Sequence, residues 1–418
     1  MSDSDLPPHR IETCIPERRE PGMMVFNVRP GGGADRSGRI GWILGVDRDG
    51  NFPLNLKFDT PAQDSCALPN GNLMFSLTGA GIIKEVTRTG ETVRQWHVAG
   101  KWQDKTPPSG SIEIDVPLTH HRVNFFPNGN LLLLSAEQRE LSDWPERDDD
   151  PNAPRGTGRV IGDVVLEVTP SGDIVKRWHL FDLLDPERLS YGSCSDYWHG
   201  LGFPGSNDWC HANAVTYDAS DDSILVSLRT QDCIIKFSRA TGALKWILGD
   251  PGNWRAPWAD KLLKPEGDLE WQYHQHDCSV TPTGTILCFD NGNNRAVPFA
   301  EKLPAPENYS RIVEFAVDED AMTVRQVWSW GKEQDDRLYG CYQGGAYRLP
   351  QTGNTFMNFG GVCTIDGVPT NRNHDGFCRA RLIEVTPENE IVFDMWIDGS
   401  GEEPPLSLSS FRSEFVPG

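Results

Sequence analysis

Two short sequence phrases alternate along most of this 418-residue chain, and their repetition limits the fold more than any other feature. The first phrase is a turn containing Gly, usually after Pro or Thr, followed by an apolar run, as in Leu68–Phe75 and Phe126–Leu134. It returns at 281–287 and 350–356, and in a looser form at 216–226. Because tight hairpin turns favour Gly and Asn, each copy predicts a β-hairpin.

The second phrase is a β-branched run, a turn and another run that ends in Trp. Its five copies end at Trp96, Trp178, Trp246, Trp328 and Trp396. Each pair of phrases predicts four short strands, and residues 23–46 resemble a sixth, partial copy. Four-stranded units repeated in a ring are typical of a propeller. We therefore predict an all-β, six-bladed β-propeller with four-stranded blades, whose irregular spacing differs from the fixed period of WD40 repeats.

The connections between strands predict where function lies. We expect an N-terminal arm at 1–22 and a single propeller domain at 23–418, in which 404–418 adds an edge strand to the first blade and closes the ring. Long connections fall on one face, at 98–119, 137–160, 181–210, 250–275, 292–310 and 362–379. Long loops on a rigid scaffold often carry function, so we expect the site on that face.

Charge and hydropathy exclude several classes of partner. Asp and Glu number 60 against 39 Lys and Arg, a net charge of −21, which argues against nucleic acid and anionic membrane surfaces as partners. We find no apolar run long enough to span a membrane. The acidic start Met1–Asp5 does not resemble a signal peptide. We expect a cytoplasmic bacterial protein whose partner is a small molecule, and the oligomeric state stays open.

The ten cysteines are spaced singly, without a CxxC pair. This spacing argues against a zinc ribbon or a thioredoxin motif. Several lie inside apolar runs, such as Cys288 within 286–289. We expect reduced, buried thiols, as is usual in the cytoplasm.

Histidine recurs at one position of the repeat, six residues before the first-phrase proline or its equivalent. That position holds Gln63, His121, His211, His276 and Gly344 in successive copies. Equivalent positions at the start of innermost strands face one ring at the channel mouth, so the three histidines are predicted to converge. Imidazole exchanges protons near neutral pH, which favours acid–base chemistry. Two alternatives stay open: the rings fill the channel by hydrogen bonding, or they hold a metal, although no local ligand spacing supports one. We predict no cofactor.

Neighbouring strand ends add further candidates on the same face. Arg229 and Arg295 offer the forked donors that suit an oxyanion, and the alternative for each is an ion pair with one of the many carboxylates. The candidate substrate-binding residues are Arg229, Asn213, Asn291, Trp198 and Tyr273. Packing between blades is the alternative for the aromatic residues.

Several motifs together resemble the aryl-sulfate sulfotransferase family. They include Asp208–Val215, Ser227–Arg229, Thr241–Gly249, Gln275–Asp277 and Phe289–Gly292. The resemblance is strongest at 205–331 and continues more weakly over 23–204 and 340–397. It implies a six-bladed propeller that moves a sulfuryl group from one phenol to another without a nucleotide donor. In such enzymes a histidine attacks sulfur, and the match implies assisting roles for His211, His276 and Arg295.

This chain departs from the family where the nucleophile is expected. The family's nucleophilic histidine follows a Phe-Gly-Gly-like segment, whereas Phe359–Gly361 is followed here by Val362–Thr364. His374 lies in the same loop and Cys363 is nearest along the chain, but sulfonation of a thiol by a sulfate ester would be unusual. We therefore expect no stable modified residue.

These observations predict an arylsulfotransferase-like enzyme that acts on a small aromatic substrate. The predicted catalytic residues are His211, His276, Arg295, His121 and His374. Two other functions stay open: a related propeller lyase or hydrolase of an aromatic compound that has lost the nucleophile, and a binding propeller without catalysis.

Overall fold

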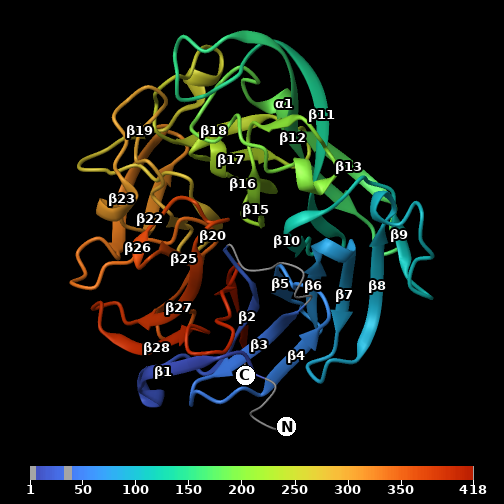
Figure 1. Cartoon of the computed structure of the whole chain (residues 1–418), viewed down its shortest axis with the longest axis vertical. Helices are drawn as coiled ribbons and strands as arrows, with labels where there is room; N and C mark the ends of the chain where they lie inside the picture. The colour runs from blue at the N-terminus through green and yellow to red at the C-terminus, as the bar shows by residue number, and fades with distance from the viewer. Residues whose placement is uncertain (1–5, 33–39, 418) are drawn as a thin grey trace.

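Residues 6–32 and 40–417 are described by the computed structural model, and their strands form six sheets around a central axis (Figure 1). The acidic start 1–5 lies outside the described residues. The first two sheets consist of β30 (Ser413–Pro417), β2 (Gly22–Pro30), β3 (Gly41–Asp47) and β4 (Leu54–Phe58), with β29 (Leu408–Ser409), and of β5 (Ser65–Ala67), β6 (Leu73–Leu77), β7 (Ile82–Val86), β8 (Thr92–Val98) and β9 (Ile112–Ile114).

The next two sheets follow in chain order. They consist of β10 (His120–Phe125), β11 (Leu131–Pro145), β12 (Arg155–Val168) and β13 (Ile174–His179), with β14 (Ser206–Asp208), and of β15 (Ala212–Asp218), β16 (Ser223–Leu228), β17 (Cys233–Ser238) and β18 (Leu244–Gly249).

The last two sheets take strands from both ends of the chain. They consist of β20 (His276–Val280), β21 (Ile286–Asp290), β22 (Arg311–Asp318), β23 (Thr323–Trp330) and β19 (Lys264–Pro265), and of β24 (Gly345–Arg348), β25 (Thr355–Ile365), β27 (Phe377–Val385), β28 (Ile391–Ile397) and β1 (His9–Cys14), with β26 (Val368–Pro369). The α-helix in the described residues is α1 (Leu180–Leu183), and the 3-10 turns are at 16–18, 78–80, 99–101, 199–201, 229–231, 258–261 and 305–307.

The prediction of an all-β propeller is confirmed. The innermost strands contact one another in a closed order: β30, β5, β10, β15, β20, β24 and β30 again. The closing strand comes from the C-terminus, since β30 pairs with β2 and is the inner edge of the first sheet. Within the segment expected to form an N-terminal arm, β1 pairs with β28 at the outer edge of the last sheet.

The repeated phrases correspond to one local structure. In the turn after Pro127, Gly129 has φ = 86°, a left-handed conformation that glycine adopts without a Cβ clash. The residue after that glycine then bonds a glutamate on the third strand: Asn130 donates to Glu167 at 2.7 Å, and Asn72 donates to Glu85 at 2.7 Å. The turn and the third strand of one sheet are thus tied together by side chains that the sequence repeats.

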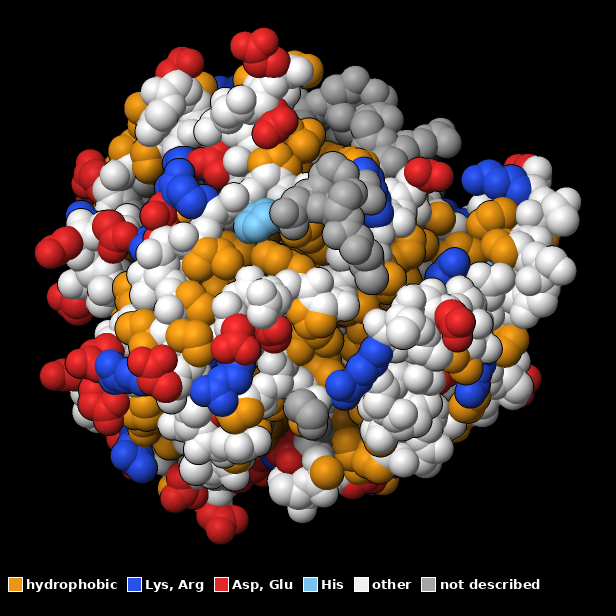
Figure 2. All heavy atoms as spheres, turned by 90° about the horizontal axis from the view of Figure 1, so that it is seen from below, with side chains coloured by type: hydrophobic (Ala, Val, Ile, Leu, Met, Phe, Trp, Pro, Cys, Tyr) orange, Lys and Arg blue, Asp and Glu red, His pale blue; other side chains and the backbone are white. Residues whose placement is uncertain are grey.

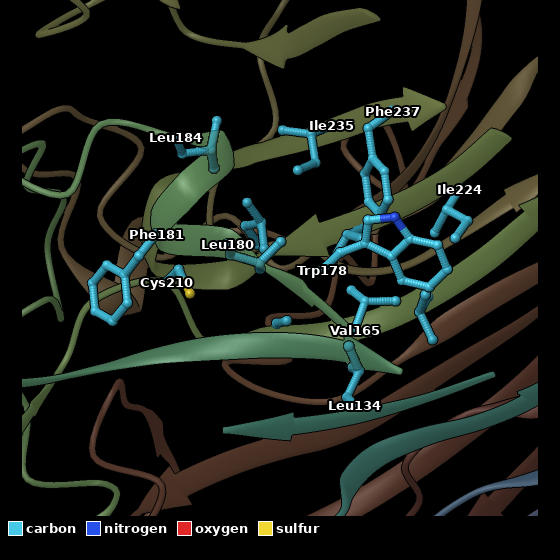
Figure 3. Packing of buried hydrophobic residues seen from close by; sticks show 14 of the residues in the cluster. Leu134, Val165, Trp178, Leu180, Phe181, Leu184, Cys210, Ile224, Ile235 and Phe237 are labelled. Atoms are coloured by element: carbon cyan, nitrogen blue, oxygen red, sulfur yellow. The ribbon is translucent and has the colours of Figure 1, made fainter. Parts of the chain in front are cut away.

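The recurring tryptophans join neighbouring sheets. The indole N–H of Trp96 donates to the Pro170 carbonyl at 3.0 Å, and that of Trp246 donates to Glu319 at 3.0 Å. Trp178 packs against Phe237, with ring centroids 5.8 Å apart, inside the apolar cluster between the third and fourth sheets (Figure 3). Because each of these partners belongs to the next sheet in chain order, the blade-ending Trp acts as a lateral contact between blades.

The prediction of a long loop at 137–160 is wrong. Residues 137–160 extend β11 and β12 as a hairpin that pairs as far as Pro145 and Arg155. Partly buried and exposed positions alternate along the first part of this extension, so the strands continue beyond their sheet as a two-stranded ribbon.

The surface charges and the helices of the described residues agree with what the charge and hydropathy of the sequence predict. On the face drawn in Figure 2, the described Lys and Arg side chains are dispersed among acidic ones. In the part of the chain that the structure describes, no helix is both long and apolar enough to cross a membrane.

Buried ion pairs link the inner strands across the axis. Arg412, just before β30, lies 2.6 Å from Asp64, and Arg122 on β10 lies 2.5 Å from Asp277 on β20. Asp64 also accepts the Val123 N–H at 2.8 Å. Because these groups are buried, each charge depends on its partner.

We predict that Arg412→Met lowers the free energy of unfolding by about 3–5 kcal/mol, because it leaves Asp64 as a buried charge without its partner. Urea denaturation measures the loss. The double variant with Asp64→Asn should lose less than the sum of the two single changes, and Arg10→Ala, in an exposed pair with Glu12, should cost less than about 1 kcal/mol. Additive losses at Arg412 and Asp64 would contradict the coupling.

Candidate active site

Three histidines from three sheets meet at the channel mouth. His276 begins β20, His211 directly precedes β15, and His121 is the second residue of β10. The imidazole centroids of His121 and His211 are 5.0 Å apart. The Phe411 ring, just before β30, lies 5.7 Å from that of His121 and 6.3 Å from that of His276. The structure therefore brings His121 and His276 to one aromatic ring, and places His211 against His121.

Irregular backbone sets the direction of these side chains. His121 and His211 have φ values of 52° and 46°, in the left-handed region that is uncommon for side chains larger than glycine. Strand pairing shifts register directly after each histidine, between His120 and Val123, between Ala212 and Ala214, and between His276 and Ser279. Such bulges redirect side chains and are frequent next to active sites.

A carboxylate fixes the His211 ring. Its Nδ1 lies 2.5 Å from Oδ2 of Asp208, whose other oxygen accepts the indole N–H of Trp198 at 2.7 Å. Because a carboxylate accepts hydrogen bonds, Nδ1 carries a hydrogen and Nε2 keeps its lone pair in the neutral ring. His211 therefore presents a basic nitrogen, and Asp208 stabilises the ring when it is protonated.

An amide fixes the His276 ring in the same tautomer. The Asn291 amide donates to the carbonyls of Gly340 and Gln343 at 2.7 and 2.9 Å, so its oxygen must accept from Nδ1 of His276 at 2.7 Å. Nε2 accepts the Gln343 N–H at 3.2 Å. Burial and the nearby Arg229 guanidinium hold the pKa of His276 well below its usual range. His276 is therefore neutral at physiological pH.

His121 is fixed by its chain neighbour. The Nδ1 atoms of His120 and His121 are 2.8 Å apart. Burial lowers the pKa of His121 far below 6.5, and His211, His120, His276 and Arg29 add to the effect. Two neutral imidazoles therefore flank His211.

The two predicted arginines have different environments. The Arg295 guanidinium lies 3.0 Å from Asp290, donates to Asn308 at 3.2 Å and to the Tyr309 carbonyl at 2.8 Å. Arg229 is partly buried, and its side chain makes no hydrogen bond or ion pair with any residue that the structure describes. Its charge acts on His276. Arg295 therefore holds neighbouring loops together, while Arg229 donates its backbone N–H to the His211 carbonyl at 3.1 Å and acts through its charge on His276.

The aromatic and amide residues that the sequence predicts to bind substrate also differ in whether they lie beside the histidines. The Tyr197 ring lies 4.3 Å from His211 and 6.1 Å from His121, so it walls the site. Trp198 is buried behind it as a partner of Asp208. The Tyr273 hydroxyl donates to Asp250 at 2.6 Å, and Asn213 is buried and donates to the Gln275 carbonyl at 2.7 Å. Of the predicted substrate-binding residues, Arg229 and Asn291 contact or influence the histidines directly.

The loop where the sequence places a nucleophile contains a disulfide. Cys363 on β25 and Cys378 on β27 face each other in the strand pairing and are joined, with Cα atoms 4.2 Å apart. The expectation of reduced thiols is wrong for this pair, because strand pairing brings together two cysteines 15 residues apart, and the other eight are free. His374 lies exposed in the turn at 373–375, before β27.

Sequence reasoning missed four residues of this site: Arg29, His120, Asp208 and Phe411. The Asp-x-x-His spacing and the histidine doublet are visible in the sequence and are the signals for Asp208 and His120. Phe411 stands at the same repeat position as the histidines, but this can be recognised only after β30 is known to be an innermost strand. Arg29 is the penultimate residue of β2 and acts electrostatically on His121.

The geometry gives no metal site within residues 6–32 and 40–417, where no group of three or more His, Cys, Asp or Glu side chains is arranged to hold a metal ion.

Solved structures of similar shape share little sequence with this chain. A protein of unknown function from Bacteroides caccae is 12% identical, with a TM-score of 0.46, and the match covers 95% of this chain and 100% of that one. A periplasmic gluconolactonase of Pseudomonas aeruginosa is 11% identical, with a TM-score of 0.41, over 94% of this chain and 99% of that one. We draw no functional conclusion from scores this low.

Sequence comparisons are more specific. The arylsulfate sulfotransferase AssT of Escherichia coli O6:H1 is 31% identical over 284 residues, which is 58% of this chain and 45% of that protein. The enzyme of the same name from Lelliottia amnigena is 31% identical over 221 residues, 43% of this chain and 36% of that protein. The chain thus spans less than half the length of these relatives. The family model for arylsulfotransferases matches residues 32–403, and the chain therefore belongs to the arylsulfotransferase family.

Proposed function

We propose that this protein transfers a sulfuryl group from an aryl sulfate to a phenol at the channel mouth. The observation that carries the proposal is a partly buried Arg229 that has no carboxylate partner among the described residues. Its backbone N–H donates to the His211 carbonyl at 3.1 Å and its charge acts on His276, and the Nδ1 atoms of all three histidines are held. Family membership and the name of the two relatives support the same reaction.

Arg229 is the proposed binding group for the sulfuryl oxygens. A guanidinium presents a planar fork of donors that matches two oxygens of a tetrahedral anion. The Arg295 guanidinium already donates to Asp290, Asn308 and Tyr309. We therefore assign the anion to Arg229, and assign to Arg295 a structural role between the loops that flank the site.

His211 is the proposed acid–base residue. During transfer, the bond from sulfur to the leaving phenolate oxygen breaks and a bond to the acceptor oxygen forms. The acceptor loses a proton and the leaving oxygen gains one, so no net proton is consumed. Imidazolium at His211, stabilised by Asp208 at 2.5 Å, can protonate the leaving oxygen through Nε2. Tyr197 and Phe411 supply faces against which an aromatic ring can pack.

Cys363 and His374, the two residues near the place where the family has its nucleophile, have environments that favour direct transfer between bound donor and acceptor. Cys363 is bonded to Cys378, and His374 is exposed in its turn. We therefore expect no covalent sulfuryl carrier among them.

The test is incubation with a chromogenic aryl sulfate, with and without a phenol acceptor. We expect phenol release that depends on acceptor, and no mass increase on the protein after incubation with donor alone. Release without acceptor would indicate a hydrolase instead. A stoichiometric adduct would indicate double displacement, and silence with every donor would contradict the proposal.

We predict that Arg229→Gln lowers kcat/KM for an aryl sulfate by about 10²-fold or more, since it removes a charged donor aimed at the transferred group. Its urea stability should stay near wild type, because Arg229 has no ion pair to lose among the described residues. Arg295→Gln should show the reverse pattern, with a clear loss of stability, because Asp290 keeps only Arg311 as a charged partner and the Tyr309 carbonyl loses its donor. Equal effects of the two changes on both measurements would contradict the assignment.

We predict that His211→Asn lowers kcat by roughly 10²–10⁴-fold with folding intact. The matched controls are His97→Asn on β8 and His179→Asn at the end of β13, both on outer strands, which should stay near wild-type activity. Equal loss at all three positions, together with loss of stability, would indicate a structural role for the histidines.

Stability should fall in mild acid. The folded-state pKa of His121 and of His276 is depressed, so below about 6.5 the unfolded chain binds protons that the folded chain does not. Stability therefore rises with pH through this window, by about 1.4 kcal/mol per pH unit for each histidine. Urea midpoints from pH 8 to pH 5 measure the slope, and His276→Asn should flatten it. An unchanged slope in the His276→Asn variant would contradict the depressed pKa of His276.

A further inference from the structure

The histidine doublet on β10 continues into a buried chain of polar groups. His121 and His120 face each other through their Nδ1 atoms at 2.8 Å. On its other side, His120 bonds through Nε2 to the Ser135 carbonyl at 3.1 Å, and the same nitrogen lies 3.1 Å from Oδ1 of Asp163. Both histidines and Asp163 are buried.

The chemistry of the partners allows one arrangement of hydrogens in this chain. A carbonyl and a carboxylate both accept, so Nε2 of His120 carries a hydrogen and its Nδ1 accepts in the neutral ring. His121 must then donate from Nδ1, which leaves Nε2 with a lone pair. The doublet thus presents a second basic nitrogen to the space that His211 also faces.

One carboxylate oxygen of Asp163 makes no hydrogen bond with the described residues. Its Oδ2 accepts the Cys210 thiol and the Ala212 N–H, each at 2.8 Å. Its Oδ1 is buried and has no hydrogen-bond partner within the described residues, although Nε2 of His120 is nearby. A fully buried oxygen without a partner is costly, and a proton arriving there would remove that cost.

Charge explains why two histidines would need different partners. The rings of His121 and His211 are 5.0 Å apart and buried, so two imidazolium ions there would repel strongly. His211 has the Asp208 carboxylate at its Nδ1, whereas His121 has a second imidazole at its Nδ1. A proton accepted by His121 must therefore leave that ring without a second cation forming.

We propose that His121, His120 and Asp163 form a proton relay that takes the proton of the acceptor hydroxyl while His211 protonates the leaving oxygen. The acceptor O–H gives its proton to Nε2 of His121, the Nδ1 hydrogen of His121 moves to His120, and the Nε2 hydrogen of His120 moves to Oδ1 of Asp163. No electrons are exchanged. After the products leave, the relay runs in reverse: Asp163 returns its proton to Nε2 of His120, the Nδ1 hydrogen of His120 returns to His121, and the Nε2 proton of His121 leaves to water. Water then delivers a proton to Nε2 of His211, so that every group returns to its starting state. This inference rests on the proposed function and adds His120 as a positioning and relay residue.

His120→Asn separates the relay from simple positioning. The Asn oxygen can occupy the place of Nδ1 and keep the hydrogen bond from His121, but it cannot pass a proton to Asp163. With an acceptor phenol of pKa about 10, we expect the transfer rate to fall by about 10²-fold. With a nitro-substituted phenol that is already ionised at the assay pH, no proton needs to be removed and we expect less than about threefold loss.

His97→Asn is the matched control, since His97 is also buried and bonds the Ser111 hydroxyl at 2.9 Å, on β8 of the second sheet. It should leave both rates unchanged. Equal loss with both acceptors in His120→Asn would indicate a structural role, and no loss with either would also overturn the relay.

A second measurement does not need turnover. Nitrogen-15 NMR of ring-labelled protein reports which imidazole nitrogen carries hydrogen, with His121→Asn to assign the signal. The relay requires the Nδ1–H tautomer of His121 at neutral pH, and an Nε2–H tautomer overturns it. If no aryl sulfate reacts at all, the proposed function fails while the tautomer still decides this arrangement.

Discussion

The ion pair between Arg412 and Asp64 supports the closure of the ring, which β30 completes by pairing with β2 and on which the positions of the other inner strands depend. It joins the C-terminal segment to the second sheet at the axis, at 2.6 Å and out of contact with solvent. Removing both charges from water is expensive, so the pair contributes to stability only because both groups are fully engaged. Asp64 bonds the backbone of Val123, and Arg412 also lies 2.6 Å from Glu414. The second pair, Arg122 with Asp277, crosses the axis between the third and fifth sheets.

These pairs directly follow residues of the candidate site along the chain. Asp64, Arg122, Asp277 and Arg412 are each the next residue after Gln63, His121, His276 and Phe411. One position of the repeat therefore carries the candidate site residues, and the next position carries buried, paired charges. Bulges and left-handed backbone at the start of the inner strands allow adjacent residues to serve these two purposes.

Most polar side chains at the channel mouth have a hydrogen-bond partner. The side chains that lack one among the described residues indicate which reaction the site supports. His211, His276 and His121 all have Nδ1 held, by a carboxylate, an amide and an imidazole respectively. What distinguishes them is the charge of the group that holds each ring, a carboxylate for His211 and neutral groups for the other two. The two arginines differ in the same respect, because Arg295 is paired with Asp290 and Glu270 and no described carboxylate pairs with Arg229.

The sequence by itself determined the propeller and the shared register of the histidines, because these follow from local periodicity and turn chemistry. Asp208 and His120 could have been found in the same way, since they sit within three residues of the histidines that they orient. The sequence could not decide which arginine lacks an ion pair among the described residues, that Cys363 is bonded to Cys378, or that Phe411 contacts the histidines. Those outcomes depend on which strands become neighbours: Asp290 reaches Arg295 at a strand end, strand pairing aligns the two cysteines, and β30 returns from the C-terminus to the axis. Contacts between residues distant in sequence are set by the closure of the ring, and only the tertiary structure specifies that closure.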